Sequence, residues 1–371
     1  MLTMPSTDVT HWIGRTLAEV DTPSLLLDAD ALRANIERMA AFFVGRRCRL
    51  RPHFKSHKCT RIARLQMEAG AVGITCAKLG EAEVLAEAGI QDILIANQIV
   101  GPPKIVRLLE LARGARPMVA VDSPENVQAL SEAAAAAGIQ LRVLVEVDIG
   151  MHRCGVAPGQ PALDLARLVA ASPGLSFEGL QGYEGHSVDL RDEAERTGKT
   201  RAALKLLVET RRHTERAGLP VRIVSGGGTG TYTLTGDYEG IDEVQAGSYA
   251  AMDWWYKDIR PEFQQAQTIL ATVISRPAPD MAIIDVGRKG VGGEWGPPRV
   301  KDIPGAEVVQ FGSEEHMGIA LPQGRLVRVG DQLQIIPSHG CTTSNLYREY
   351  VLHRNGTVTD IWPIEGSGKL R

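Results

Sequence analysis

A lysine that follows an apolar run is the residue in this sequence best placed for covalent chemistry. The segment Arg51-Pro52-His53-Phe54-Lys55-Ser56-His57-Lys58 closes a strand-like run from Leu50 to Phe54, and Lys55 comes directly after it. A buried amine can hold an aldehyde cofactor as a Schiff base. The competing interpretation is a solvated loop lysine, the usual fate of this residue type. For His53 and His57, two positions to either side, we favour ordinary hydrogen bonds over chemistry.

A histidine and a cysteine near the C-terminus have the spacing of a ligand pair. His339 and Cys341 lie in Pro337-Ser338-His339-Gly340-Cys341-Thr342-Thr343. In extended backbone, side chains two positions apart leave the same face, so both could hold one ion. A single pair is a weak zinc signal, and chance co-occurrence is the alternative. A lysine for an aldehyde and a metal pair together suggest chemistry on an amino acid.

The composition is that of an ordinary globular protein. The chain has 371 residues, 44% of them hydrophobic, with 41 basic and 44 acidic residues and a net charge of −3. This balance gives no reason to expect nucleic acid or a membrane as a partner. The polar N-terminus, Met1 to Val9, lacks a signal-peptide core, and the five cysteines lack disulfide-framework spacing. We therefore expect a cytoplasmic protein with mostly free thiols.

Short apolar runs alternate with helix-length segments over the first two thirds of the chain. This alternation is typical of parallel βαβ units, and eight of them predict a (β/α)8 barrel. A helix with Leu32, Ile36, Met39 and Phe43 on one face precedes all eight. The eight predicted strands are Leu50–Phe54, Val72–Cys76, Ile93–Ala96, Met118–Val121, Val143–Val147, Glu178–Gly182, Val221–Val224 and Glu243–Ala246.

The last third of the sequence has closely spaced strands and predicts a separate all-β domain. Asn355-Gly356 lies between two strand-like runs and predicts a tight hairpin turn. The run Ser24–Leu27 is surplus to the eight and could pair with this domain. We expect residues 28–255 to form the barrel that binds the cofactor, and residues 1–27 and 256–371 to form the β domain with the metal site. The other strands expected there are Thr268–Ser275, Met281–Asp285, Leu326–Val329 and Gln332–Ile336.

Polar and glycine-rich segments follow the predicted strands, at the barrel face where active sites lie. Ser225-Gly226-Gly227-Gly228-Thr229-Gly230-Thr231 follows the seventh strand and Gly247-Ser248-Tyr249 the eighth. Loops after these two strands commonly form a phosphate site, so we expect phosphate binding there rather than plain turns. Arg153, after the fifth strand, could face a cofactor ring nitrogen or could fix a loop. The candidates for contact with a cofactor at this face are Lys55, Arg153, Tyr183, Ser225, Gly227, Gly228, Thr229, Gly247, Ser248 and Tyr249.

The combination of segments resembles the D-threonine aldolase and D-serine dehydratase family, the fold-type III pyridoxal-phosphate enzymes related to alanine racemase. The resemblance runs nearly end to end. It rests on Asp21-Thr22-Pro23-Ser24-Leu25, Arg51-Pro52-His53-Phe54-Lys55, Arg153-Cys154-Gly155-Val156, Ser225-Gly226-Gly227-Gly228-Thr229-Gly230, Gln245-Ala246-Gly247-Ser248-Tyr249 and Pro337-Ser338-His339.

The resemblance implies a role for each of these segments. Lys55 would carry pyridoxal 5'-phosphate, Arg153 would meet the pyridine nitrogen, and the two glycine loops would bind the phosphate. His339 and the residue two beyond it would bind a divalent metal near the substrate's β-hydroxyl. The family also implies a homodimer.

Two positions depart from the aldolase branch of the family. That branch typically has aspartate where this chain has Cys341, whereas the dehydratase branch typically has cysteine. A thiolate favours zinc over manganese or magnesium. Aldolases also place a histidine after the sixth strand, where this chain aligns Asp189; His186, three residues earlier, could substitute. We expect His186 and Asp189 to handle the β-hydroxyl proton.

We predict a metal-assisted pyridoxal-phosphate lyase that cleaves β-hydroxy-D-amino acids to glycine and an aldehyde. The first alternative is a dehydratase acting on D-serine or 3-hydroxy-D-aspartate, giving a 2-oxo acid and ammonia. A racemase needs no metal, and a non-catalytic cofactor carrier would need neither His339 and Cys341 nor the large β domain. Both are therefore less favoured.

Overall fold

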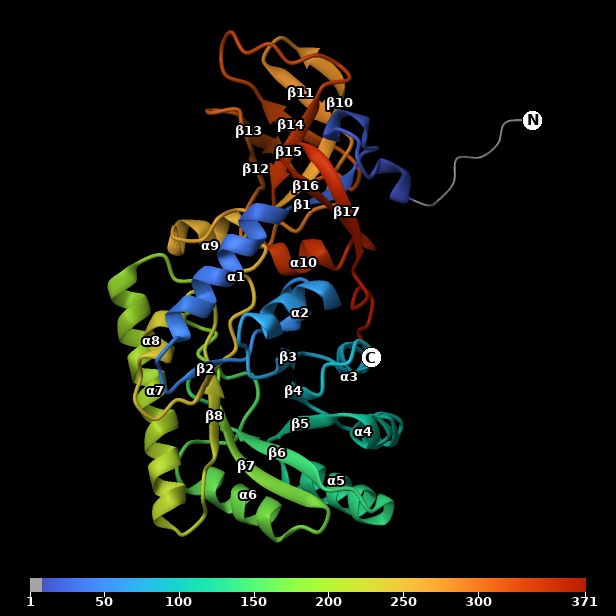
Figure 1. Ribbon diagram of the computed structural model, residues 1–371. Helices are drawn as coiled ribbons and strands as arrows, with labels where there is room; N and C mark the ends of the chain where they lie inside the picture. Colours follow the sequence, from blue (N-terminus) through green and yellow to red (C-terminus); the bar gives the residue numbers. More distant parts are fainter. Residues whose placement is uncertain (1–8) are drawn as a thin grey trace, which may run out of the picture. The chain divides into compact units, whose positions relative to one another are not determined.

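The computed structural model describes residues 9–371 and contains two compact units (Figure 1). One comprises residues 37–55, 60–247 and 368–371, here called the barrel unit. The other comprises the described residues up to Ile36, residues 56–59 and residues 248–367, here called the β unit. The expectation for the polar N-terminus falls mainly on residues 1–8, outside the described part. Among the described residues, no helix is long and apolar enough to cross a membrane.

Eight parallel strands form the sheet of the barrel unit, in the order β2-β9-β8-β7-β6-β5-β4-β3. The ring closes between its two ends, because the Val72 N–H donates to the Leu50 carbonyl at 3.0 Å and the Thr75 N–H to the Pro52 carbonyl at 2.9 Å. The strands are β2 (Arg49–Leu50), β3 (Ile74–Cys76), β4 (Asp92–Gln98), β5 (Arg116–Val121), β6 (Leu141–Glu146), β7 (Leu175–Gln181), β8 (Ile223–Gly226) and β9 (Glu243–Val244). The predicted barrel is confirmed.

Helices follow the barrel strands and pack against them (Figure 1). They are α2 (Thr60–Glu68), α3 (Leu79–Glu87), α4 (Pro102–Gly114), α5 (Pro124–Ala137), α6 (Gln160–Ala171), α7 (Glu193–Arg216) and α8 (Tyr232–Gly236). Helix α5 shows how the sequence sets their ends. The Ser123 hydroxyl accepts the Asn126 N–H, Pro124 starts the helix, and Gly138 ends it at a φ of 65°.

The β unit contains a mostly antiparallel sheet of nine strands. Its members are β1 (Ser24–Asp28), β10 (Gln267–Ala278), β11 (Met281–Ile284), β12 (Arg299–Val300), β13 (Glu307–Gln310), β14 (Met317–Ala320), β15 (Gln332–Ile336), β16 (Glu349–Arg354) and β17 (Thr357–Pro363). Strand β1 pairs with β10 and β16, so the surplus N-terminal strand does join the β sheet. Asn355 and Gly356 turn the β16–β17 hairpin with φ values of 51° and 79°.

The short helices of this unit are η1 (Val9–Trp12), η2 (Leu17–Glu19), α9 (Trp254–Ile259) and α10 (Gly340–Ser344). Helix α1 contains residues of both units. Helix α1 (Ala29–Phe43) buries Leu32, Ile36, Met39 and Phe43, as their spacing predicted.

Two predicted strands are wrong in part or in whole. The first barrel strand ends at Leu50, and Phe54–Ser56 form the 3₁₀ turn η3, so Lys55 lies in that turn. Pro52 has no N–H for a ladder. Leu326–Val329 is a loop, with Leu326 83% exposed and Val329 62% exposed. Asp331 holds that loop by accepting the Arg328 N–H at 2.7 Å, which favours a turn over a strand.

Candidate active site

Tyr183 brings two of the predicted cofactor residues together in the barrel unit. Its ring centroid lies 5.9 Å from Lys55 Nζ and 5.5 Å from the central guanidinium carbon of Arg153. Tyr183 follows β7, Arg153 follows β6, and Lys55 follows β2, so three strand ends supply the group. An amine and a guanidinium beside one aromatic ring suit a flat cofactor that carries an aldehyde.

Local hydrogen bonds hold the lysine segment in place. His53 Nδ1 accepts the peptide N–H of Lys55 at 3.4 Å. In the β unit, His57 Nδ1 accepts the Cys59 N–H at 3.3 Å. Both histidines therefore make the hydrogen bonds that we favoured over a chemical role.

A buried carboxylate lies beside Arg153. Glu146, at the end of β6, lies 3.9 Å from an Arg153 nitrogen and accepts the Gln98 amide at 2.6 Å. Burial raises the pKa of Glu146 above its ordinary value, although Gln98 and Arg153 pull it down. Glu146 and Arg153 both line a small hollow, together with Asp148, Met151 and Tyr183.

The glycine-rich loop after β8 forms a tight cradle. A Cβ on Gly226 would lie 2.2 Å from the Gly182 carbonyl oxygen, and Gly227 has a φ of 78°. A Cβ on Gly228 would lie 3.6 Å from the Tyr183 ring, so this glycine faces the aromatic group. Ser225 is fully buried, and its hydroxyl accepts the Gln245 amide at 2.9 Å. Thr229 is 2% exposed. Such a cradle is compatible with a phosphate, because its glycines keep side chains away from the backbone at Gly226 and Gly227.

Two backbone N–H groups of this loop donate hydrogen bonds to side chains of the protein. The Gly227 N–H donates to Glu184 at 3.1 Å, and the Gly228 N–H donates to the Thr231 hydroxyl at 3.2 Å. Glu184 was not among the residues predicted from the sequence. The one signal for it was its position, in the polar segment that follows the sixth predicted strand.

His186 presents a buried nitrogen next to the loop that carries Arg153. Its Nδ1 has no hydrogen-bond partner among the described residues. A Cβ on Gly150 would lie 3.2 Å from the His186 ring. Asp189, by contrast, is half-buried and already engaged in other interactions. His186 is therefore the better placed of the two for accepting a proton.

The predicted metal pair lies in the β unit, at the start of α10. Their backbone differs from the expected extended pair, because His339 is extended with φ −132° while Cys341 lies in the first turn of α10. Cys341 nevertheless acts on His339, because it raises the pKa of that ring. Cys341 Sγ also lies 3.4 Å from the Ser56 hydroxyl and 3.6 Å from the Ser248 hydroxyl. Ser248 is thus placed beside the cysteine.

Acidic and aromatic groups surround His339. Its ring stacks on Trp295 with centroids 4.1 Å apart, and its Nδ1 lies 3.5 Å from a Glu294 oxygen without hydrogen-bond geometry. Burial disfavours a charged ring, but Cys341, Asp253 and Glu294 outweigh it and raise the pKa of His339 to about 9. Burial in turn raises the pKa of Asp253 to about 6.

His339 and Cys341 are a ligand pair suited to a metal ion that keeps coordination positions open for other ligands. Within residues 9–371, no cluster of three or more histidine, cysteine, aspartate or glutamate side chains is arranged around a common point. The pair supplies one nitrogen and one sulfur, which are zinc-type ligands, and leaves room for others. An unpartnered buried Nδ1 on His339 is consistent with this use.

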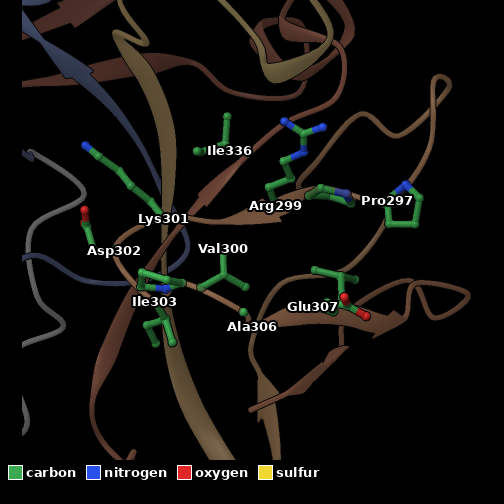
Figure 2. A pocket seen from close by; sticks show the side chains of 13 residues that line it. Pro297, Arg299, Val300, Lys301, Asp302, Ile303, Ala306, Glu307 and Ile336 are labelled. Atoms are coloured by element: carbon green, nitrogen blue, oxygen red, sulfur yellow. The ribbon is translucent and has the colours of Figure 1, made fainter. Parts of the chain in front are cut away.

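Tyr249, one of the predicted cofactor contacts, packs against a phenylalanine. Tyr249 is fully buried, with its ring centroid 5.8 Å from that of Phe263. A hollow of about 670 Å³ in the β unit is lined by residues 297–308 and Ile336 (Figure 2). It contains none of the predicted site residues. None of the five cysteines forms a disulfide.

Family models match both parts of the chain. Residues 27–253 match the N-terminal domain of alanine racemase, and residues 266–353 match a putative serine dehydratase domain. A D-threonine aldolase of Arthrobacter sp. is 40% identical over 96% of this chain and 96% of its own length. A 3-hydroxy-D-aspartate aldolase of Paracoccus denitrificans is 36% identical, covering 98% of this chain and 96% of the relative.

Solved structures give the same picture. The D-threonine aldolase of Filomicrobium marinum superposes with a TM-score of 0.94 at 40% identity, over 97% of this chain and 99% of that one. The D-threo-3-hydroxyaspartate dehydratase of Delftia sp. HT23 gives 0.84 at 29% identity, over 94% and 98%. Two further structures are dehydratase variants in which a histidine and a cysteine, two positions apart, were each replaced by alanine; the cysteine variant is metal-free.

Proposed function

Because the chain belongs to the D-threonine aldolase and D-serine dehydratase family, whose barrel is the alanine racemase N-terminal domain, we propose that it is a pyridoxal-phosphate lyase that cleaves β-hydroxy-D-amino acids to glycine and an aldehyde. The observation that carries the metal-assisted form of this proposal is the place of His339 and Cys341 at the start of α10, where His339 Nδ1 is buried without a hydrogen-bond partner among the described residues. The 40% identity to a D-threonine aldolase, over nearly the full length of this chain, supports the reaction type.

The cofactor would be held from several strand ends. Lys55 would bind its aldehyde, Arg153 would meet the ring nitrogen, and the loop from Ser225 to Thr231 would receive the phosphate together with Gly247 and Ser248. Pyridoxal phosphate, when bound, supplies the electron sink for the pair released at Cα. The Tyr183 ring, which adjoins both Lys55 and Arg153, would pack against the cofactor.

The chain's own groups would manage charge and protons. His186 would accept the proton of the β-hydroxyl, because its buried Nδ1 has no hydrogen-bond partner among the described residues. Glu146 would keep the Arg153 guanidinium oriented through their 3.9 Å ion pair. A divalent ion held by His339 and Cys341 would polarise the β-hydroxyl.

A dehydratase is the second candidate, and the identity of the metal ligands favours it. The solved dehydratase variants point to a histidine and a cysteine with the spacing of His339 and Cys341. In that reaction, the β-hydroxyl leaves as water and the products are a 2-oxo acid and ammonia. We rank this candidate second because the aldolase relatives are more similar over the whole chain.

Incubation with 3-hydroxy-D-aspartate and with D-threonine separates the two candidates. Mass spectrometry of the products would find glycine with the matching aldehyde if the chain is an aldolase. A 2-oxo acid with one equivalent of ammonia would assign it to the dehydratases. Conversion to the L-amino acid without either product would refute both and indicate a racemase.

A further inference from the structure

A buried carboxylate organises the glycine-rich loop from within. Glu184 is 0% exposed and follows Tyr183 after β7. Its Oε2 accepts the Gly227 N–H at 3.1 Å. Its Oε1 accepts the hydroxyls of Thr231 and Thr235 at 2.8 Å and 2.7 Å. A buried carboxylate is costly unless it is hydrogen-bonded, so these three bonds tie the loop to Glu184.

The bonds also fix the direction of the next hydrogen bond in the loop. Since the Thr231 hydroxyl donates its proton to Glu184, it is left as an acceptor for the Gly228 N–H, which reaches it at 3.2 Å. Glu184 thereby determines the orientation of two successive peptide groups. Gly228 is the residue that faces the Tyr183 ring.

The backbone of Glu184 is held as firmly as its side chain. Its carbonyl oxygen accepts both the N–H and the hydroxyl of Ser187 at 2.9 Å. The Ser187 hydroxyl in turn lies 2.9 Å from the Thr200 hydroxyl of α7. Adjacent residues of one anchored segment therefore face different parts of the site, Tyr183 toward Lys55 and Arg153, and Glu184 into the loop.

We propose that Glu184 is a positioning residue for the cofactor's phosphate, holding the loop from Ser225 to Thr231 in the shape that receives it. The inference rests on the proposed function, in which this loop is the phosphate site. Glu184 itself does not touch the phosphate, and a negative charge below the loop would by Coulomb's law weaken anion binding. Glu184 instead contributes by fixing the geometry of the loop. Its removal should therefore weaken phosphate binding, whereas charge repulsion alone predicts that its removal would strengthen it.

The test compares two ligands that differ in the phosphate alone. Pyridoxal phosphate and pyridoxal both carry the aldehyde, so the ratio of their dissociation constants isolates the phosphate. The ratio is measured by visible-absorbance titration for the wild type, for Glu184→Gln and for the control Glu178→Gln. Glu178 lies on β7 and accepts the Ser176 hydroxyl at 2.8 Å, away from the loop.

We expect Glu184→Gln to weaken pyridoxal phosphate binding by about tenfold, because bonds to a charged acceptor are lost, and to change pyridoxal binding by less than about twofold. Glu178→Gln should leave the ratio unchanged. An unchanged ratio in Glu184→Gln, or tighter binding of pyridoxal phosphate, would overturn the proposal. If the wild type itself bound both ligands equally, the phosphate loop of the proposed function would fail, which is a distinct result.

A second pair of variants covers the case in which Glu184→Gln does not fold. Thr235→Val keeps the side-chain shape but removes one hydroxyl from Glu184, whereas Thr235→Ser keeps the hydroxyl. Thr235→Val should lower the preference for pyridoxal phosphate by about threefold, the effect of one weaker hydrogen bond. Thr235→Ser should retain the wild-type ratio. Equal ratios in the two variants would contradict the role given to Glu184.

Discussion

Lys55 Nζ lies 5.9 Å from the centre of the Tyr183 ring, although the two residues follow different strands of the barrel. Arg153 lies 5.5 Å from the same centre. The three side chains give the proposed cofactor an aldehyde partner, a ring neighbour and a positive charge. Each of these roles has its own experimental signature.

The covalent role of Lys55 is tested by reductive labelling. Borohydride reduction of the cofactor-loaded protein should place the label on the peptide that contains Lys55. Lys55→Ala should fold normally but lose activity by at least about a thousandfold, as expected when a covalent catalyst is removed. Lys78→Ala, at the exposed position after β3, is the matched control and should retain both label and activity. Label on Lys58 or Lys78 would reject the assignment.

The glycine cradle predicts sensitivity to a side chain at Gly228. Its Cβ would lie 3.2 Å from Val188 and 3.6 Å from Tyr183, so the methyl groups of valine must displace one of them. Gly228→Val should weaken pyridoxal phosphate binding by about tenfold or more, with an unchanged circular dichroism spectrum. Gly114→Val, where a Cβ meets no atom within 4 Å, should bind normally. Equal affinity in both variants would place the phosphate elsewhere.

The His339–Cys341 pair predicts a metal requirement. Chelation should abolish lyase activity while leaving the visible spectrum of the lysine-bound cofactor, since the metal acts on substrate. Cys341→Asp should shift the preference toward manganese or magnesium, because a carboxylate is a harder ligand than a thiolate. Cys48→Ala, at a buried cysteine beside the Arg49 carbonyl, is the control and should not change activity. Full activity in a preparation that elemental analysis shows to be free of metal would refute the role of His339 and Cys341 as ligands of a required metal.

Glu146 predicts a pH-dependent difference in stability. Its pKa is raised by burial, so the folded state holds this proton more tightly than the unfolded state does. The contribution of Glu146 to stability is therefore present below about pH 4.5 and is lost as the pH rises through the raised value. The Tm of Glu146→Gln relative to wild type should increase between pH 4.5 and 7.5 by about 2 °C or more. A constant difference across this range would contradict the raised pKa.

The elements that the sequence predicted well are those set by local chemistry. Asn355-Gly356 can adopt the positive φ values of a tight turn, and the hairpin formed there. The apolar spacing in α1 likewise specified its buried face. Leu326–Val329 had the apolar residues of a strand, but Asp331 closes a turn that leaves Leu326 and Val329 in solvent. Strand β13, mostly exposed, gave no apolar pattern to detect.

The residues that the sequence missed act across long separations. Glu184 acts on Gly227, which is 43 positions away, and Asp253 accepts the Gly340 N–H from 87 positions away. No local pattern reports such a pairing. Lys55 could be proposed because its flanking segment is distinctive, and His339 and Cys341 because ligand spacing is visible in a sequence. Carboxylates that hold a loop or a turn have no comparable signature.

Carbon-13 at the α-carbon of D-threonine tests the central claim most directly. The metal-loaded protein is incubated with this substrate, and the fate of the label is followed by NMR. Cleavage of the Cα–Cβ bond predicts that the label appears in glycine, with one equivalent of unlabelled acetaldehyde, and that Lys55→Ala forms neither. Label in 2-oxobutanoate, with release of ammonia and no glycine, would contradict the aldolase assignment.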